Sequence, residues 1–330
     1  RTYFHILKSR KLIINMPNNE RNKHKPNNGE IDLIDFFKIL INGKWIIAFL
    51  SASMFIISFF YSLSLPNIYQ TSAILNPKQP DDMLSGSLKS FSGLANIAGI
   101  NLPSNGGDNI ASKAIKKAGS LSFFEKNIMP NIYLPELMAV KYWDEETSSL
   151  IFDDSIYNEK TKTWIRHFSF PQKQIPSSQE SFRVFKEDHF NINEDKSNGF
   201  VTLSVRHQSP HVAKKWNELI INQINIFYRQ QEKESALKSV NYLNKQINIA
   251  SLSETKQALA QLLQNEIQKL TLIESHEEYV FEIIDPPVIM EEKSDPQRTL
   301  IYILSTFFGL IIGITIVFTR HYYLNAKDNV

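Results

Sequence analysis

Cysteine is absent from the 330-residue chain. Its absence excludes disulfide frameworks, cysteine-based zinc sites, iron–sulfur clusters and thiol catalysis together. A large excess of one charge is lacking as well, because 36 Lys and Arg residues face 34 Asp and Glu residues. The net charge of +2 argues against a strongly basic nucleic-acid-binding protein, so we expect no nucleic-acid partner.

Charged residues are also missing from two long apolar blocks, one near each end of the chain. Residues 45–65 read WIIAFLSASMFIISFFYSLSL, and residues 300–319 read LIYILSTFFGLIIGITIVFT. A helix of about 20 residues rises ~30 Å, which is the thickness of a bilayer's hydrocarbon core. Neither block has the polar face of a helix on a soluble core. We therefore predict transmembrane helices over residues 45–65 and 299–319.

A cleaved signal peptide is the alternative for the first block. The sequence Ser62-Leu63-Ser64 resembles a small-residue cleavage site. The apolar block is longer, however, than the apolar core of about 7–15 residues that signal peptides usually have. About 44 residues also precede the block, so a membrane helix remains the better interpretation.

Positive charge is concentrated before the first block. Residues 1–44 hold nine Lys or Arg and four Asp or Glu, whereas residues 66–298 hold 25 and 29. Positively charged flanks of membrane helices tend to stay in the cytoplasm. We expect a bacterial inner-membrane protein with both termini in the cytoplasm and residues 66–298 in the periplasm.

The two ends of the chain are predicted to be short cytoplasmic segments. Residues 1–29 are rich in Asn, Lys and Pro and are expected to be disordered. Their first 15 residues precede Met16, a plausible natural start, and are interpreted either as a non-native remnant or as a genuine basic extension. Residues 30–44 are predicted to form a juxtamembrane helix, and residues 320–330 a tail.

The middle of the chain combines strand and helix patterns. Residues 67–75 predict a strand with Tyr69, Thr71, Ala73 and Leu75 on one face. Further strands are predicted over residues 162–168, 182–185, 189–193, 200–207 and 279–284. Helices are predicted over residues 109–129 and 134–142, with a loop of small residues over 85–108. The strands are expected to form one mixed or antiparallel sheet in a base made of residues 66–208 and 276–298.

One long helix is predicted from Ser209 to about Ala250. Ser209 is the expected N-cap and Pro210 the first helical residue, and no further Pro or Gly interrupts the segment. Its apolar row begins with Val212, Trp216, Ile220, Ile224 and Phe227. A second helix is expected to start with a capping box over residues 251–254 and to reach residue 275. Residues 209–275 thus predict a projecting helical hairpin, and the fold class is an α+β membrane protein.

Some histidines, acidic clusters and tryptophans could carry either a chemical or a purely structural role. His207 and His211 have HxxxH spacing, but Pro210 separates them at a strand-to-helix junction, so solvated histidines are expected rather than a metal site. The acidic clusters over residues 81–82, 144–146 and 153–154 are interpreted as solvated loops rather than acid–base catalysts. Trp143, Trp164 and Trp216 could stack on sugars, but core packing is favoured. We predict no catalytic residue, no cofactor and no metal.

Gly309 and Gly313 form a GxxxG pattern in the second apolar block. That spacing lets membrane helices approach closely, and the partner would be the first span, a neighbouring subunit or another membrane protein. Chance is the alternative, because glycine is frequent in membrane helices.

The order of these parts resembles a known family. The matching segments are residues 31–45, 66–75, 182–206 and 285–313. The last contains the link DPPVIMEEKSDPQR, with Pro286, Pro287 and Pro296, followed by the glycine-bearing apolar block. This arrangement resembles the Wzz-type chain-length determinants, the polysaccharide co-polymerases of Gram-negative inner membranes. Residues 143–181 depart from it, since they look longer and more polar than a minimal member would carry.

The resemblance implies a non-enzymatic regulator of polysaccharide chain length. It implies a bell-shaped homo-oligomer whose walls are long helices, with membrane lipid, the O-antigen polymerase and lipid-linked glycan as partners. Such a protein sets the modal length of lipopolysaccharide O-antigen or a related surface glycan. Some relatives carry a cytoplasmic tyrosine kinase, but only 11 residues follow Thr319 here, so any kinase is expected to be a separate protein.

Three other functions share part of this pattern. An inner-membrane sensor also places a domain between two spans, but the 11 residues after Thr319 leave little room for a signalling output. A polysaccharide exporter or periplasmic adaptor would share the helical hairpin. A membrane-anchored hydrolase is the weakest alternative, because no nucleophile–base set is visible.

Overall fold

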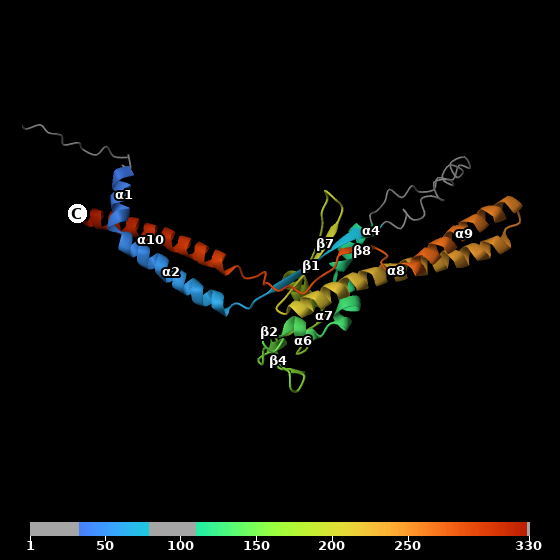
Figure 1. Cartoon of the computed structure of the whole chain (residues 1–330), viewed down its shortest axis with the longest axis horizontal. Coiled ribbons are helices and arrows are strands. Elements are labelled where there is room, and N and C mark those ends of the chain that lie inside the picture. The colour runs from blue at the N-terminus through green and yellow to red at the C-terminus, as the bar shows by residue number, and fades with distance from the viewer. Residues whose placement is uncertain (1–32, 79–109, 329–330) are drawn as a thin grey trace, which may run out of the picture. The chain divides into compact units, whose positions relative to one another are not determined.

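The computed structural model describes residues 33–78 and 110–328, and the chain divides into two compact units. The first unit contains α1 (Leu33–Asn42), α2 (Lys44–Ser64) as far as Ser58, and α10 (Arg298–Asp328) from Tyr302 onward. The helices Lys44–Ser64 and Arg298–Leu324 are both long and apolar enough to cross a membrane. The apolar blocks of the sequence thus form two continuous helices (Figure 1).

The second unit is organised around a four-stranded antiparallel sheet with the order β6-β7-β1-β8. Its strands are β1 (Tyr69–Pro77), β6 (Phe190–Glu194), β7 (Val201–His207) and β8 (Phe281–Asp285). The alternation in β1 is confirmed, since Tyr69, Thr71, Ala73 and Leu75 are all buried. They pair in register with buried residues of β7, for example Ala73 with Leu203, so one face of the sheet is the core face.

A tight turn precedes β7. Gly199 has a φ of +77°, a left-handed conformation that glycine adopts without steric cost. Asp195 stabilises the same turn with two backbone hydrogen bonds. Its N–H donates to Phe200 O, and its carbonyl oxygen accepts from the Gly199 N–H. This connection sets the register of β6 against β7.

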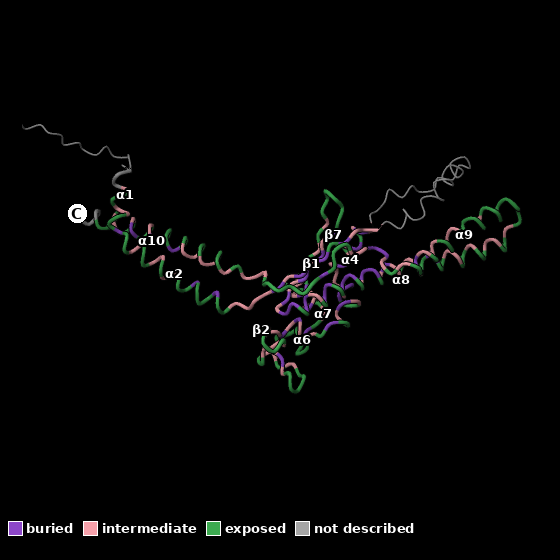
Figure 2. The backbone as a smooth tube through the Cα atoms, in the orientation of Figure 1, coloured by how far each residue is buried: buried purple, intermediate pink, exposed green. Residues whose placement is uncertain are grey.

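Helix α8 (Pro210–Ile249) covers the core face of the sheet with its N-terminal half. Ser209 caps the helix, with its Oγ accepting a hydrogen bond from the Val212 backbone N–H at 3.5 Å. Trp216, Ile220 and Ile224 are at most 1% exposed. Beyond Tyr228, most residues of α8 are partly or fully exposed, as the change of colour along the helix in Figure 2 shows.

Helix α9 (Ser253–Ser275) returns alongside α8, so residues 210–275 form the predicted hairpin (Figure 1). Lys269 Nζ pairs with Glu232 Oε2 at 2.8 Å, and Lys233 pairs with Glu274. The predicted capping box is wrong, because α9 begins at Ser253, and Leu252 at the N-cap offers no side-chain hydrogen bond.

Smaller elements lie around the sheet and the first half of α8. The helices are α4 (Ile110–Ala118), α5 (Leu121–Phe123), α6 (Leu134–Met138) and α7 (Ser178–Val184), with single π-helical turns over Phe124–Ile128 and Phe185–His189. Two short hairpins pair β2 (Val140–Asp144) with β3 (Ser149–Phe152), and β4 (Tyr157–Asn158) with β5 (Thr163–Trp164).

Four of the predicted elements are wrong in whole or part. Residues 182–185 lie mainly in α7, because Ser177 Oγ caps that helix by accepting from Glu180 N. Residues 109–129 are not one helix, since Ser120 starts a new one by capping Phe123 N. Residues 140–142 are strand rather than helix, because β2 pairs with β3. Within residues 162–168, only Thr163 and Trp164 pair with another strand.

The predictions for residues 1–29, for the loop over residues 85–108 and for the acidic pair at residues 81–82 lie outside the described residues.

Candidate functional site

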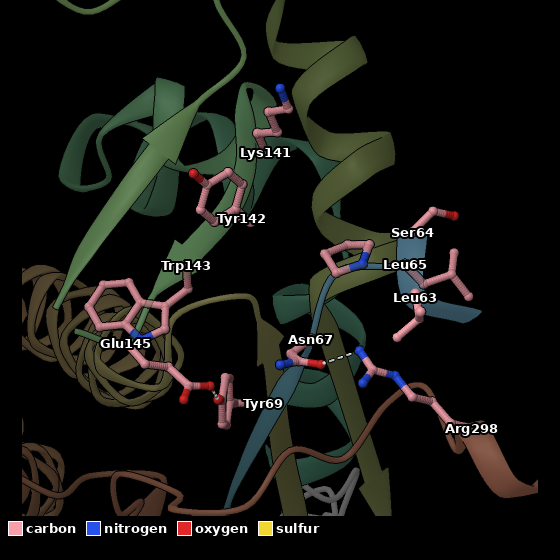
Figure 3. A pocket seen from close by; sticks show the side chains of 11 residues that line it. Leu63, Ser64, Leu65, Asn67, Tyr69, Lys141, Tyr142, Trp143, Glu145 and Arg298 are labelled. Carbon is pink, nitrogen blue, oxygen red and sulfur yellow. Dashed lines mark hydrogen bonds between the residues drawn. The ribbon is translucent and has the colours of Figure 1, made fainter. Parts of the chain in front are cut away.

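A pocket of about 350 Å³ lies where both candidate spans end in the second unit. The last turn of α2 and the segment before β1 form one side, and Arg298, the first residue of α10, lies with them (Figure 3). Strand β2 and the turn after it form the other side. The lining residues are Leu63, Ser64, Leu65, Pro66, Asn67, Tyr69, Lys141, Tyr142, Trp143, Glu145 and Arg298.

Backbone pairing brings the two span ends together. Ile68 N donates to Asp295 O at 2.9 Å, and Ser294 N donates to Ile68 O at 2.9 Å. This pairing places Asn67 beside the residues that lead into α10. Asn67 Oδ1 then accepts from Arg298 Nη2 at 3.2 Å and from Lys293 Nζ at 3.2 Å. Two cations therefore share one neutral amide oxygen.

Arg298 has unused hydrogen-bonding capacity. Its Nε is buried and has no hydrogen-bond partner. Among the described residues, no carboxylate forms an ion pair with Arg298, Lys293 or Lys141. The positive charges of Arg298 and Lys293 on this side of the pocket are therefore not paired with a carboxylate among the described residues.

The opposite side carries aromatic rings and one carboxylate. Trp143 and Glu145 face Leu63, Leu65 and Arg298 across Asn67 in Figure 3. The Tyr69 hydroxyl donates to Glu145 Oε1 at 2.7 Å. Burial, together with this bond to Glu145, raises the pKa of Tyr69 to about 12, so the phenol remains a donor.

The turn after β2 explains the position of Glu145. Asp144 accepts hydrogen bonds from the Glu146 backbone N–H at 3.0 Å and from the Thr147 hydroxyl at 2.7 Å. The Thr147 bond is the main cause of the lowered pKa of Asp144. The cluster over residues 144–146 thus shapes a turn, as the solvated-loop interpretation expected, and Glu145 projects from it toward Tyr69. Asp153 likewise accepts from Ser155, which lowers the pKa of Asp153.

The histidine prediction is half wrong. His211 is exposed, as expected, but His207 is only 2% exposed. The His207 ring lies 4.9 Å from Trp216 and 5.4 Å from His189, centroid to centroid. Its Nδ1 accepts from Ser209 N and its Nε2 donates to Glu136 O, both at 2.9 Å. Both ring nitrogens are therefore occupied, and the described residues contain no group of three side chains suited to a metal.

The three tryptophans have different surroundings. Trp216 is fully buried in the core, as predicted. Trp143 and Trp164 are outside the core cluster, so core packing is wrong for them. Trp143 lines the pocket described above and lies 5.6 Å from the His211 ring. Trp164 lines a separate pocket of about 310 Å³ and packs against Tyr157.

The two glycines of α10 lie against α2 within the first unit. A Cβ added at Gly309 would be 2.8 Å from Ser51 Cα, and one at Gly313 would be 2.9 Å from Ile47 Cα. Both distances are shorter than atoms tolerate, so larger residues at these positions would push the two backbones apart. A Cβ at Gly43 would instead meet the side chain of Val317.

The remaining predicted residues lie in the second unit. Of the long-helix set, Ser209, Pro210, Trp216, Ile220 and Ile224 are buried, and Phe227 is half-buried against the core. Of the link prolines, Pro286 is exposed, Pro287 is buried and Pro296 is intermediate. Next to this link, the Thr71 hydroxyl donates to Val288 O at 2.8 Å, which holds the link beside β1.

Sequence reasoning missed the pocket residues as a set. Arg298 and its neighbour Lys293, which does not itself line the pocket, were not singled out, and Trp143 and Glu145 were considered only as separate candidates. The available signal was that aromatic and basic residues gather at the ends of membrane spans. Their convergence depends on the pairing of Ile68 with Ser294 and Asp295, which the sequence does not display.

The fold defines a class of protein in which two apolar helices, each long enough to cross a membrane, flank a mixed α/β domain with one long helix. Residues 29–126 match the family model of the Wzz chain length determinant proteins. Residues 251–322 match the model described as a G-rich domain on putative tyrosine kinase, abbreviated GNVR. Over these two segments the chain is similar to the Wzz chain length determinant family, a family of non-catalytic regulators.

Solved structures and curated sequences were also compared. A full-length bacterial polysaccharide co-polymerase is 13% identical, with 89% of this chain and 99% of that chain covered and a TM-score of 0.39. A fragment of the polysaccharide co-polymerase WzzB from Salmonella Typhimurium is 10% identical, with 69% and 100% covered and a TM-score of 0.30. The comparison with curated proteins finds no match.

Proposed function

We propose that the chain sets the modal length of a surface polysaccharide, namely lipopolysaccharide O-antigen or a related glycan. It acts on the membrane polymerase while the growing glycan is linked to its lipid carrier. The observation that carries this proposal is the Wzz family match over residues 29–126, in a chain whose two apolar helices flank a large α/β domain.

The proposed location is the bacterial inner membrane. Both termini lie in the cytoplasm, and residues 66–298 form the periplasmic domain. The charge distribution supports this topology, because residues 1–44 hold nine Lys or Arg against four Asp or Glu. The close approach of α10 to α2 at Gly309 and Gly313 supports a further proposal, that these glycines pack the two spans together.

The working form in this proposal is a homo-oligomer built along the helical hairpin. The outer part of the hairpin leaves several large apolar side chains exposed: Leu237, Tyr242, Ile249, Leu252, Leu262 and Ile267. A single hairpin of this length cannot bury them within its own chain. Contact with neighbouring copies would remove this apolar surface from water, which is favourable by about 25 cal/mol per Å².

Deletion of the gene tests the function. Surface polysaccharide from the deletion strain would be separated by gel electrophoresis beside wild type and beside a strain that re-expresses the chain from a plasmid. We expect the band cluster at the modal length to disperse on deletion and to return on re-expression. Unchanged lengths of every surface glycan would refute the proposal.

A further inference from the structure

The pocket at the span ends has a location that suits a lipid headgroup. Leu63 and Leu65 come from the apolar end of α2, while Asn67 and Arg298 lie at the polar edge. Tyr142 and Trp143 add the aromatic side chains that are enriched at membrane–water interfaces. A lipid beside the ends of these two helices could place its headgroup in this pocket.

The charges in the pocket favour an anion. Arg298 and Lys293 share the Asn67 amide oxygen, and the Arg298 Nε is buried without a partner. Lys141 lines the opposite rim. The only lining carboxylate among the described residues is Glu145, and its Oε1 is already bonded by the Tyr69 hydroxyl. Guanidinium groups bind phosphate oxygens with strong, directional hydrogen bonds.

We propose that this pocket binds the phosphate group of an anionic membrane lipid. Arg298 supplies the Nη hydrogens that it does not use on Asn67 to the phosphate oxygens, and Lys141 adds a second charge from the other rim. Glu145 accepts a hydroxyl of the headgroup. The proposal rests on the proposed membrane location of α2 and α10, but it is independent of the proposed function in polysaccharide synthesis. The lipid is either a phospholipid or a lipid-linked glycan, because both carry this phosphate chemistry.

The test uses the purified full-length chain in detergent, with bound lipid measured by native mass spectrometry. Phosphatidylglycerol is titrated against phosphatidylcholine, whose choline cation neutralises its phosphate. We expect the wild type to retain phosphatidylglycerol preferentially. Arg298→Gln and Lys141→Gln should each weaken that retention about tenfold, whereas Lys256→Gln on the exposed face of α9 should not change it.

Asn67→Asp separates ligand binding from a structural role. The new carboxylate would pair with both Arg298 and Lys293. It would therefore strengthen the contact between the segment before β1 and the start of α10 while cancelling the charge that attracts phosphate. We expect unchanged or higher thermal stability together with lost phosphatidylglycerol retention. Equal retention by Asn67→Asp or by Lys141→Gln, or no preference of the wild type for phosphatidylglycerol, would overturn the proposal.

Two further competition experiments identify which molecule supplies the phosphate. A polyprenyl-diphosphate-linked sugar that displaces phosphatidylglycerol at lower concentration would assign the pocket to the lipid-linked glycan; the reverse order would assign it to phospholipid. Inorganic phosphate that competes as well as either lipid would contradict a lipid site.

Discussion

At the scale of single residues, His207 is a buried imidazole held in one neutral form. Its Nδ1 accepts the Ser209 N–H at the start of α8, and its Nε2 donates to Glu136 O. Burial, with the neighbouring His189 ring as the second cause, lowers the pKa of His207 to about 3. Burial also lowers the pKa of His189. Protonation of His207 would remove the acceptor that the Ser209 amide uses.

These two histidines predict an acid-sensitive fold. The unfolded chain has histidines of pKa about 6.5, so below that pH it binds protons that the folded chain does not. The contribution of these neutral histidines to the free energy of unfolding should therefore be complete above about pH 6.5. It should decrease as the pH falls toward 3, the pKa of folded His207. Each such histidine contributes about 1.4 kcal/mol per pH unit.

Thermal unfolding of the full-length chain in detergent between about pH 7 and pH 5 would measure this effect. His207→Gln cannot titrate and should show a shallower decline than wild type. His211→Gln, on α8 just beyond the end of β7 and exposed, is the control and should keep the wild-type slope. Identical slopes for His207→Gln and wild type would contradict the assignment.

Asn225 is a second residue whose role is specific. Its Oδ1 accepts from Val280 N at 2.8 Å and Phe281 N at 3.0 Å, and its Nδ2 donates to Phe281 O at 3.0 Å. The side chain thereby supplies hydrogen-bond partners to backbone N–H and C=O groups at the start of β8. Asn225 is itself buried and only 4% exposed.

Asn225→Ala should destabilise the fold by about 2–4 kcal/mol, because it leaves several buried backbone groups without partners. Chemical denaturation would measure the change. Asn222→Ala, exposed and one turn earlier on α8, should stay within about 0.5 kcal/mol of wild type. Equal effects of the two substitutions would show that the Asn225 bonds do not stabilise the fold.

At the scale of secondary-structure elements, α2 and α10 approach each other where glycine removes the side chain. Gly313→Val would place a branched side chain against Ile47 Cα, where even a Cβ is only 2.9 Å away. We expect a loss of about 1–3 kcal/mol, typical of overpacking. Thermal unfolding in detergent compares this variant with Ile312→Val, whose side chain is 38% exposed. A Gly313→Val protein as stable as Ile312→Val would show that close packing is dispensable.

The helical hairpin supports a prediction about assembly. Leu262 and Ile267 on α9 are 48% and 47% exposed. The double variant Leu262→Ser, Ile267→Ser should shift the particle to a smaller mass in light scattering while its helical circular dichroism is preserved. Gln261→Ser, Gln264→Ser on the same helix is the matched control. An unchanged mass for the apolar pair would place the subunit contacts elsewhere.

The success of sequence reasoning differs between elements for a physical reason. Strand β7 and helix α8 were predicted because their own periodicity and the Ser209-Pro210 start are local signals. The strand predicted at residues 182–185 failed because the cap at Ser177 outweighed a short apolar run. The first part of β2, residues 140–142, was predicted as helix because its conformation depends on pairing with β3, which local propensity does not contain.

At the scale of the whole molecule, the family resemblance and the two long apolar helices could be predicted, but the pocket could not. Apolar length and the order of parts are properties of the linear sequence. The pocket instead depends on residues more than 220 positions apart, since Asn67 meets Lys293 and Arg298. His207 shows the same limit, because its burial follows from Trp216 packing above β7.

The central claim is that this chain determines glycan length, and the most direct measurement is the length distribution of surface polysaccharide. A deletion strain would re-express the wild-type chain or the Leu262→Ser, Ile267→Ser variant at matched protein levels. We predict that the wild type restores a cluster of bands around one modal length, while the variant gives a ladder that decays steadily with length. A steadily decaying ladder with the wild-type chain as well would contradict the account.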